Sequence, residues 1–243
     1  MSDTPRFHLS SIPPDGLVSL EGPEARHAVR VLRLGAGDAL CVFDGAGREA
    51  LCRVTEAARG RILARVESEH EARHPEPAVR LCFYPSLSKG ERFSWTLQKL
   101  CELGAAEITP VLSRRCVVRD WTEQKALRHR RILTEAARQS GRGHLPVLHG
   151  LTPLETLLPR LRDGITLFCH ETAPIGLKQT LDASGAFRAA HVFTGPEGGY
   201  APEEAARALE CGARPVRMGN AVLRCETAPL TAAAALLYAA GQL

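Results

Sequence analysis

Closely spaced cysteine pairs are absent from this 243-residue chain. Its eight cysteines stand far apart, at positions 41, 52, 82, 101, 116, 169, 211 and 225. A structural zinc site and a small disulfide-rich domain both need cysteines at close spacing, so both classes are excluded. Cysteines scattered through apolar segments are typical of buried free thiols in a reducing compartment. We therefore expect a cytoplasmic protein that binds no metal.

Long apolar runs are also missing. No segment approaches the roughly 20 apolar residues that cross a bilayer, so we expect no membrane partner. The first residues, Met1-Ser-Asp-Thr-Pro-Arg6, mix charges and lack the apolar core of a signal peptide, so we expect no secretion. The P-loop, the dinucleotide fingerprint G-x-G-x-x-G and the nucleophile elbow G-x-S-x-G are absent as well, which excludes three common kinds of active site.

Positive charge is concentrated in the middle of the chain, although the net charge of the whole is only +4. Residues 75–150 carry thirteen basic and seven acidic side chains, whereas the parts before and after them each have a net charge of −1. Guanidinium groups pair with phosphate and stack on bases, so this segment favours a nucleic-acid partner. A solvated helix face explains a lone run of charge about equally well.

The first 74 residues have the pattern of a small separate domain. Apolar segments at 17–20, 39–43, 49–55 and 60–66 are separated by glycine turns, and 23–34 has the spacing of one amphipathic helix. We expect a small β-barrel with one early helix, joined to the rest by a linker at 68–77.

From residue 75 to residue 243, strand-like and helix-like segments alternate. We expect strands at 79–84, 108–112, 165–169, 190–194 and 215–217, and helices at 88–103, 122–140, from 152 onward, 202–209 and 226–239. Ser88 with Glu91, and Thr152 with Glu155, form candidate capping boxes at two of the helix starts. The alternation predicts an α/β domain with a parallel sheet covered by helices on both faces.

Two glycine-bearing loops in the last quarter of the chain form the candidate site. Gly195-Pro-Glu-Gly-Gly199 and Met218-Gly-Asn-Ala-Val-Leu-Arg-Cys-Glu-Thr227 each follow a strand-like segment and precede a helix. Glycine lets a backbone approach a ligand closely, and ligands of such folds lie at the carboxyl ends of the strands. Either loop alone is compatible with a simple tight turn. Together they predict a binding pocket beside Arg224, Glu226 and Thr227.

At this point the chain resembles a known family. The two loops, Gln98-Lys-Leu-Cys-Glu-Leu-Gly104 and Glu135-Ala-Ala-Arg-Gln-Ser-Gly-Arg142 resemble the bacterial 16S ribosomal RNA uracil-N3 methyltransferases. His27-Ala-Val-Arg-Val-Leu-Arg33 is similar to the PUA-like amino-terminal domain of that family. The resemblance implies a SPOUT-type catalytic domain with a carboxyl-terminal trefoil knot. It also implies S-adenosylmethionine as cofactor, a homodimer, and 16S ribosomal RNA in the small ribosomal subunit as substrate. We accordingly expect an RNA-binding domain at 1–74 and a methyltransferase domain at 75–243.

The resemblance assigns the cofactor pocket, while the chemistry of the reaction suggests the catalytic residues and the distribution of charge suggests the RNA-binding ones. The expected cofactor-binding residues are Leu167, His170, Thr194, Gly195, Pro196, Glu197, Gly198, Gly199, Met218, Gly219, Val222, Leu223 and Thr227. We expect Arg224 to stabilise charge that develops on the uracil oxygens, and Glu197 or Glu226 to take the N3 proton. The expected RNA-binding residues are Arg30, Arg33, Arg114, Arg115, Arg128, Arg131, Arg138 and Arg142.

One departure from the family pattern affects the second loop. The family usually has Leu-Gly-Pro-Arg before its Leu-Arg-Thr-Glu-Thr segment, whereas this chain has Asn220 and Ala221 in place of Pro-Arg, and Cys225 in place of the first Thr. Two other functions remain open at this stage. One is methylation of a transfer RNA or of a ribose 2′-hydroxyl, and the other is a non-catalytic RNA-binding role in ribosome assembly.

Overall fold

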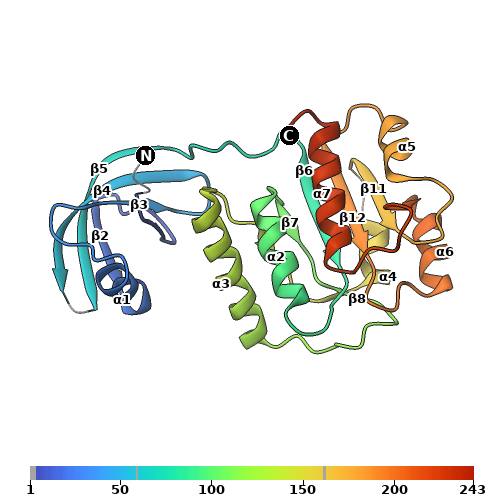
Figure 1. The fold of residues 1–243 in the computed structure, drawn as a ribbon, viewed down its shortest axis with the longest axis horizontal. Coiled ribbons are helices and arrows are strands. Elements are labelled where there is room, and N and C mark those ends of the chain that lie inside the picture. Colours follow the sequence, from blue (N-terminus) through green and yellow to red (C-terminus); the bar gives the residue numbers. More distant parts are fainter. Residues whose placement is uncertain (1–3, 59, 161–162) are drawn as a thin grey trace. The chain divides into compact units, whose positions relative to one another are not determined.

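The chain folds into two compact units. The structure is a computed structural model that describes residues 4–58, 60–160 and 163–243 (Figure 1). Unit 1 consists of Met1–Pro75 together with Ala137–Leu145, and unit 2 of Glu76–Ala136 together with Pro146–Leu243. The chain therefore leaves the first unit, returns to it once and leaves it again, which the sequence pattern does not reveal.

Unit 1 is a curled five-stranded sheet with one helix. Its strand order is β1(Arg6–His8), β3(Ala39–Phe43), β4(Arg48–Ala58), β5(Arg61–Glu71), β2(Leu17–Glu21). Every pairing is antiparallel except that of β1 with β3. The helix α1(Gly22–Arg30) buries Ala25 and Ala28 in a core that the alternate residues of the strands complete. Sequence reasoning missed β1, because three residues are too few to show a period.

The segment Ala137–Leu145 completes unit 1. The Leu145 amide donates to the Gly45 carbonyl (2.9 Å), and the Gly47 amide donates to the Gly143 carbonyl (3.2 Å). The Arg6 guanidinium pairs with Glu49 at 2.8 Å and also donates to the Arg142 carbonyl at 3.3 Å. Glu49 has no exposed surface, so Arg6 compensates a fully buried charge.

Unit 2 is built on a six-stranded, all-parallel sheet, which confirms the predicted fold class. Its order is β13(Arg214–Val216), β11(Ile165–Cys169), β12(Ala189–Thr194), β6(Arg80–Pro85), β7(Glu107–Ile108), β9(Val147–Leu148). The central strands are buried along most of their length, as expected of strands covered on both faces. A separate short pair joins β8(Val111–Leu112) to β10(Thr152–Pro153).

Helices cover both faces of this sheet. On one face α7(Thr227–Ala239) lies against β6 and β12 and contacts α2(Arg92–Glu102) and α5(Leu177–Asp182) (Figure 1). On the other face α4(Leu154–Leu157), the short 3-10 helix η1(Leu158–Arg160) and α6(Pro202–Glu210) pack on Tyr84, Phe168 and Phe193. The helix α3(Glu123–Ser140) begins in unit 2, and its last residues belong to unit 1. The trefoil knot stays a prediction.

Several predicted boundaries are wrong, each for a local reason. The strand expected at 108–112 is divided into β7 and β8 around Pro110, because proline cannot donate a ladder hydrogen bond. Neither candidate capping box forms: α2 begins at Arg92 without a side-chain cap, and Thr152 lies in β10. The first helix ends at Arg30 rather than at 34, and Arg33 takes a positive φ of 57°. The expected linker is shorter, since β5 reaches Glu71.

In the part of the chain that the structure describes, no helix combines the length and the apolar character needed to cross a bilayer. All eight cysteines are free thiols, and six of them are buried.

Candidate active site

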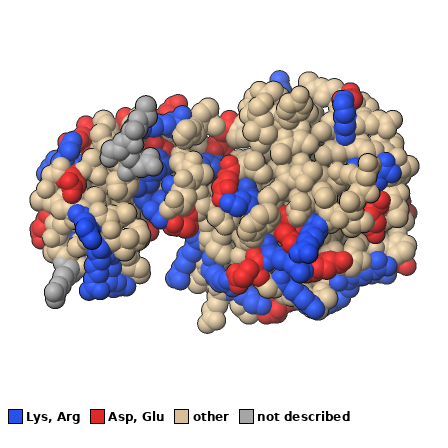
Figure 2. All heavy atoms as spheres, viewed as in Figure 1, with Lys and Arg blue, Asp and Glu red and all other residues tan. Residues whose placement is uncertain are grey.

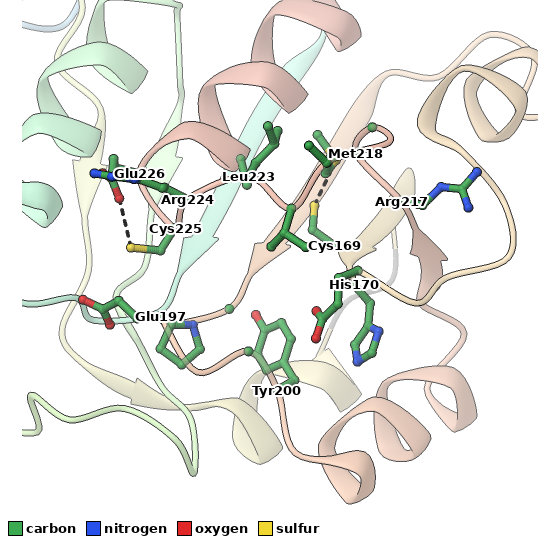
Figure 3. Close-up of a pocket in the computed structure, with 18 of the residues that line it drawn as sticks. Cys169, His170, Glu197, Tyr200, Arg217, Met218, Leu223, Arg224, Cys225 and Glu226 are labelled. Atoms are coloured by element: carbon green, nitrogen blue, oxygen red, sulfur yellow. Dashed lines mark hydrogen bonds and ion pairs between the residues drawn. The ribbon is translucent and has the colours of Figure 1, made fainter.

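Three neighbouring strands of unit 2 end at one pocket. Because β13, β11 and β12 are adjacent and parallel, the segments that follow them emerge at the same edge of the sheet. Cys169 ends β11 and residues 170–171 follow it, residues 195–200 follow β12, and residues 217–226 follow β13. Together with Arg92 and Ala228 they line a cavity of about 580 Å³ (Figure 3). We call 195–200 the first loop and 217–226 the second loop.

The first loop is shaped by its glycines. Gly199 has a φ of +66°, and its amide closes a turn on the Pro196 carbonyl at 2.9 Å. A Cβ atom on Gly195 would stand 3.3 Å from the ring of Tyr200, which itself stacks on Phe168 with the ring centroids 4.2 Å apart. Aromatic packing beneath thus fixes the loop, and the bare glycine backbone above it is open to a ligand.

One side of the pocket is apolar and rich in sulfur. The thiol of Cys169, at the end of β11, lies 3.5 Å from the Met218 sulfur, and Leu223 completes this side (Figure 3). Burial raises the pKa of Cys169 to about 12, so its thiol stays neutral at physiological pH. This side therefore offers soft, uncharged contacts and no nucleophile.

The opposite side carries charge, and Arg92 lies at its centre. The Arg92 guanidinium donates to Glu197 at 3.0 Å, and its Nε lies 3.9 Å from Glu226. The Lys89 amide also donates to Glu197 at 3.0 Å. Burial opposes ionisation of Glu197, but these donors outweigh it, and the pKa of this carboxyl is lowered. Arg92 on α2 consequently joins a carboxylate of the first loop to a carboxylate of the second.

Glu226 has further partners within its own loop. The Cys225 thiol donates to Glu226 at 3.2 Å, while the Arg224 guanidinium is 4.0 Å away. Burial and the bond to Glu226 together raise the pKa of Cys225 to about 11, so the thiol acts as a donor rather than as a thiolate. The Arg224 side chain is 79% exposed, whereas that of Glu226 is only 16% exposed. Arg224 is thus available to a second ligand in the pocket.

Most of the cofactor-binding residues expected from the sequence line this pocket. Those that do are His170, Gly195, Pro196, Glu197, Gly198, Gly199, Met218, Gly219, Val222 and Leu223. Leu167 and Thr194 are buried in the sheet, and Thr227 begins α7, where its amide donates to the Arg224 carbonyl at 2.9 Å. All three expected catalytic residues, Glu197, Arg224 and Glu226, are also among the lining residues.

Sequence reasoning missed other residues of the pocket. These are Arg92, Glu171, Tyr200, Arg217 and Ala228, whereas Asn220, Ala221 and Cys225 lie within the predicted second loop and Cys169 ends the predicted strand 165–169. Most are neighbours of the expected residues along the chain and follow from the geometry of the loops. Arg92 carries no such signal, since it lies about a hundred residues before the first loop and only the fold brings it there.

The arginines expected to bind RNA differ in their surroundings. Arg30, Arg33, Arg114, Arg115, Arg128 and Arg131 are exposed, and Arg138 is half-buried. Arg114 pairs with Glu203 and Arg128 with Glu91, and basic atoms interleave with acidic ones over much of the surface in Figure 2. Arg142 is only 6% exposed, so the expectation that it contacts RNA phosphate is wrong for this structure. Its backbone carbonyl instead receives Arg6 in unit 1.

Among the described residues, no group of three or more histidine, cysteine, aspartate or glutamate side chains is arranged to hold a metal ion.

Comparisons with known proteins agree with the geometry of the pocket. Residues 74–237 match the family model described as an RNA methyltransferase domain, and residues 20–67 match an RNA methyltransferase PUA domain. The ribosomal RNA small subunit methyltransferase E of Mycobacterium tuberculosis is 32% identical, with 95% of this chain and 90% of that protein covered. The protein of the same name from Bacillus subtilis is 31% identical, with 90% and 89% covered.

Solved structures extend the likeness to the whole fold. A ribosomal RNA small subunit methyltransferase E from Neisseria gonorrhoeae, bound to S-adenosyl methionine, superimposes with a TM-score of 0.88 at 32% identity, with 97% of each chain covered. A methyltransferase from Legionella pneumophila, solved in complex with the same cofactor, gives a TM-score of 0.89 at 29% identity and covers 97% of this chain and 98% of its own.

Proposed function

This chain belongs to the RNA methyltransferase family whose members include ribosomal RNA small subunit methyltransferase E, and from that premise we propose its reaction. It transfers a methyl group from S-adenosylmethionine to N3 of a uracil in 16S ribosomal RNA. The observation that carries the proposal is the convergence of three strand ends on one pocket in which Arg224 is exposed beside Glu226.

The residues of the pocket fit S-adenosylmethionine. A volume of about 580 Å³ lies within the range of roughly 300–1,000 Å³ typical of small-molecule sites. The bare backbone at Gly195, Gly198 and Gly199 suits close contact with a flat base, and the Cys169–Met218 side suits the apolar parts of the molecule. Two related proteins of the same fold bind this cofactor, which supports the same assignment here.

The chain's own residues perform two tasks in the reaction. S-adenosylmethionine supplies an electrophilic methyl group when it is bound. Arg224 donates hydrogen bonds to a carbonyl oxygen of the flipped uracil, where negative charge develops as N3 becomes nucleophilic. With the cofactor bound, the residues that line the pocket would hold N3 next to the methyl group. A carboxylate would take the N3 proton while the methyl group passes from the cofactor sulfur to N3, which leaves S-adenosylhomocysteine.

The structure favours Glu226 over Glu197 as that carboxylate. Glu197 is bound by both the Lys89 amide and Arg92, and its lowered pKa makes it a weak base. Glu226 lies beside Arg224, and Arg92 and Arg224 are about 4 Å away from it rather than in hydrogen-bonding contact. We assign Glu197 to bracing the first loop and Glu226 to accepting the proton.

Substitution of Arg224 tests the proposal. We expect Arg224→Ala to lower kcat by about 10²–10³-fold, because one charge-stabilising donor contributes that much. The affinity for S-adenosylmethionine, measured by calorimetry, should change only a few-fold. Mass spectrometry of 16S ribosomal RNA from a deletion strain, with and without the restored gene, should locate one N3-methyluracil. Near-normal activity of Arg224→Ala would remove its role, and a methyl group on a ribose or on transfer RNA would overturn the assignment of the substrate.

Three further properties belong to the same proposal. The enzyme acts in the cytoplasm, its RNA is presented within the small ribosomal subunit, and it works as a homodimer. Free thiols and the family membership support the first two. Sedimentation equilibrium tests the third, since a dimer has twice the chain mass of 26.3 kDa. Comparing naked 16S RNA with isolated subunits as substrates tests the second.

A further inference from the structure

A tight turn presents two arginines beside the first loop. The Cys116 amide closes residues 113–116 on the Ser113 carbonyl at 3.1 Å, and the Cys116 thiol lies 3.4 Å from the Ser113 amide. Ser113 and Cys116 are buried, whereas Arg114 and Arg115 at the tip are exposed. The base of the turn is therefore fixed in the protein, and its tip faces solvent.

The turn is joined to the first loop by two contacts. The Glu204 carboxylate, almost fully buried, accepts the Arg114 amide at 2.8 Å and the Ala201 amide at 2.8 Å. Ala201 directly follows the first loop. The Arg115 guanidinium donates to the Gly198 carbonyl at 2.9 Å, and its side-chain stem lies against Gly198, where an added Cβ would stand 3.4 Å from the Arg115 Cβ. A displacement of the turn would therefore be transmitted to the first loop.

The two arginines differ in how their charge is compensated. Arg114 pairs with Glu203 at 3.3 Å and with Glu155 at 4.0 Å, so it is committed to the protein. Arg115 has the Gly198 carbonyl as its hydrogen-bond acceptor and, among the described residues, no carboxylate within 4.0 Å. A guanidinium has five N–H donors in a planar fork, so the remaining edge of Arg115 is suited to a phosphate group.

We propose that Arg115 binds a phosphodiester of the RNA next to the target nucleotide while it holds the Gly198 carbonyl, so that RNA and methyl donor bind cooperatively. This inference rests on the proposed function, because it names the part of the RNA that the same site recognises. A phosphate on the free edge fixes the guanidinium, which in turn fixes the first loop in the form that receives the donor. The coupling is reciprocal, so bound donor strengthens RNA binding by the same factor.

The test measures binding in the absence of turnover. S-adenosylhomocysteine, which has no methyl group to transfer, is titrated into the protein with and without small ribosomal subunits from a deletion strain. For the wild type we expect its Kd to fall by about tenfold when subunits are present. Arg115→Ala should abolish this difference. For binding of the small subunit itself, the same variant should reduce the slope of log K against log salt concentration by about one unit. Arg115→Lys keeps the positive charge but not the planar guanidinium. It should therefore keep the salt dependence of subunit binding and lose the effect of subunits on the Kd of S-adenosylhomocysteine.

Arg131→Ala is the matched control. Arg131 is exposed on α3 and has no ion pair among the described residues, so its removal should reduce the salt slope and leave the coupling intact. Coupling in Arg115→Ala within twofold of wild type would overturn the inference, as would a wild type without coupling. A wild type that shows coupling but makes no N3-methyluracil would overturn the proposed function and leave this inference standing. Unchanged thermal unfolding confirms that each variant is folded.

Discussion

At the scale of single residues, Arg92 links both loops of the pocket, although no motif in the sequence marks it. It is the side chain that connects the two loops to α2, through Glu197 and Glu226. We expect Arg92→Ala to weaken S-adenosylmethionine binding by about tenfold, because both carboxylates lose a cationic partner and the loops loosen. Calorimetry measures this affinity.

Arg207→Ala is the control for Arg92. Arg207 pairs with Glu210 on the surface of α6, outside the pocket, so its loss should leave cofactor affinity unchanged. Equal affinities for the wild type and Arg92→Ala would show that the loops hold their shape without Arg92.

Cys225 permits a second test at this scale. Its pKa of about 11 keeps the thiol protonated up to about pH 10, so the S–H group can donate a hydrogen bond to Glu226. We expect Cys225 to react with iodoacetamide at pH 8 far more slowly than free glutathione, as measured by mass spectrometry. Cys225→Thr should retain activity within a few-fold, because a hydroxyl donates the same bond, whereas Cys225→Val should lower it. Rapid alkylation at pH 8 would contradict this arrangement.

The residues of the two loops could be named from the sequence because glycine-rich motifs are local. Arg224, Glu226 and the stretch from Gly195 to Gly199 lie where the motif predicts. Arg92 shows the limit, and so does the contact of Arg115 with Gly198, since both depend on partners about 80 to 105 residues away along the chain. Leu167 and Thr194 show another: a residue beside a motif can face the core of the sheet instead of the pocket.

At the scale of elements, an aromatic cluster joins α2 to α3. His129 of α3 stacks on Trp121 with ring centroids 5.0 Å apart and meets Phe93 of α2 edge-on at 5.2 Å. Burial, followed by the charges of Arg128 and Lys125, lowers the pKa of His129 to about 4. The histidine is therefore neutral in the folded protein at physiological pH.

This cluster predicts a specific acid sensitivity. The unfolded chain binds a proton on His129 below pH 6.5 and the folded chain only near pH 4. Stability is therefore complete above pH 6.5 and falls between pH 6.5 and 4, by roughly 1 kcal/mol per pH unit. His129→Phe keeps a ring in place and removes the titration, so its free energy of unfolding in urea should fall less over this range. Parallel curves for the two proteins would contradict the prediction.

Strand and helix boundaries were predictable where hydrophobic pattern alone decides them. The bounds of β3 and β11 match those expected, since both strands are short apolar runs with clear ends. The capping boxes failed because Ser88 lies four residues before α2 begins at Arg92, and Thr152 pairs with Val111 in β10 instead of preceding a helix directly. A capping motif is a local preference, and packing of the surrounding chain can override it.

At the scale of the whole molecule, the two-part composition of unit 1 predicts that a fragment of residues 1–75 alone is less stable to heat. Residues 1–75 alone lack the Arg142 and Gly143 carbonyls and the Leu145 amide, which together supply three hydrogen bonds to unit 1. At about 1 kcal/mol for each, we expect the fragment to unfold roughly 10–20 °C below the same fragment with residues 137–145 joined to it by a flexible linker.

Circular dichroism during heating measures both midpoints. The control is the joined fragment with residues 137–145 in scrambled order, which should behave like 1–75 alone. Equal melting temperatures for all three would show that unit 1 is complete without the returning segment. The sequence suggested two domains but not this return, because residues 137–145 are too short to carry a domain signature.

The returning segment also sets an order of events while the chain is being made. Leu145 lies 70 residues beyond Pro75, so at about 5–20 residues per second the ribosome synthesises it several seconds after the first part of unit 1. Throughout that interval the turn between β3 and β4 of the nascent sheet lacks the partners of the Gly45 carbonyl and the Gly47 amide. A translational pause between these points would lengthen the exposure of that turn, and the yield of native protein would then depend on codon choice within this interval.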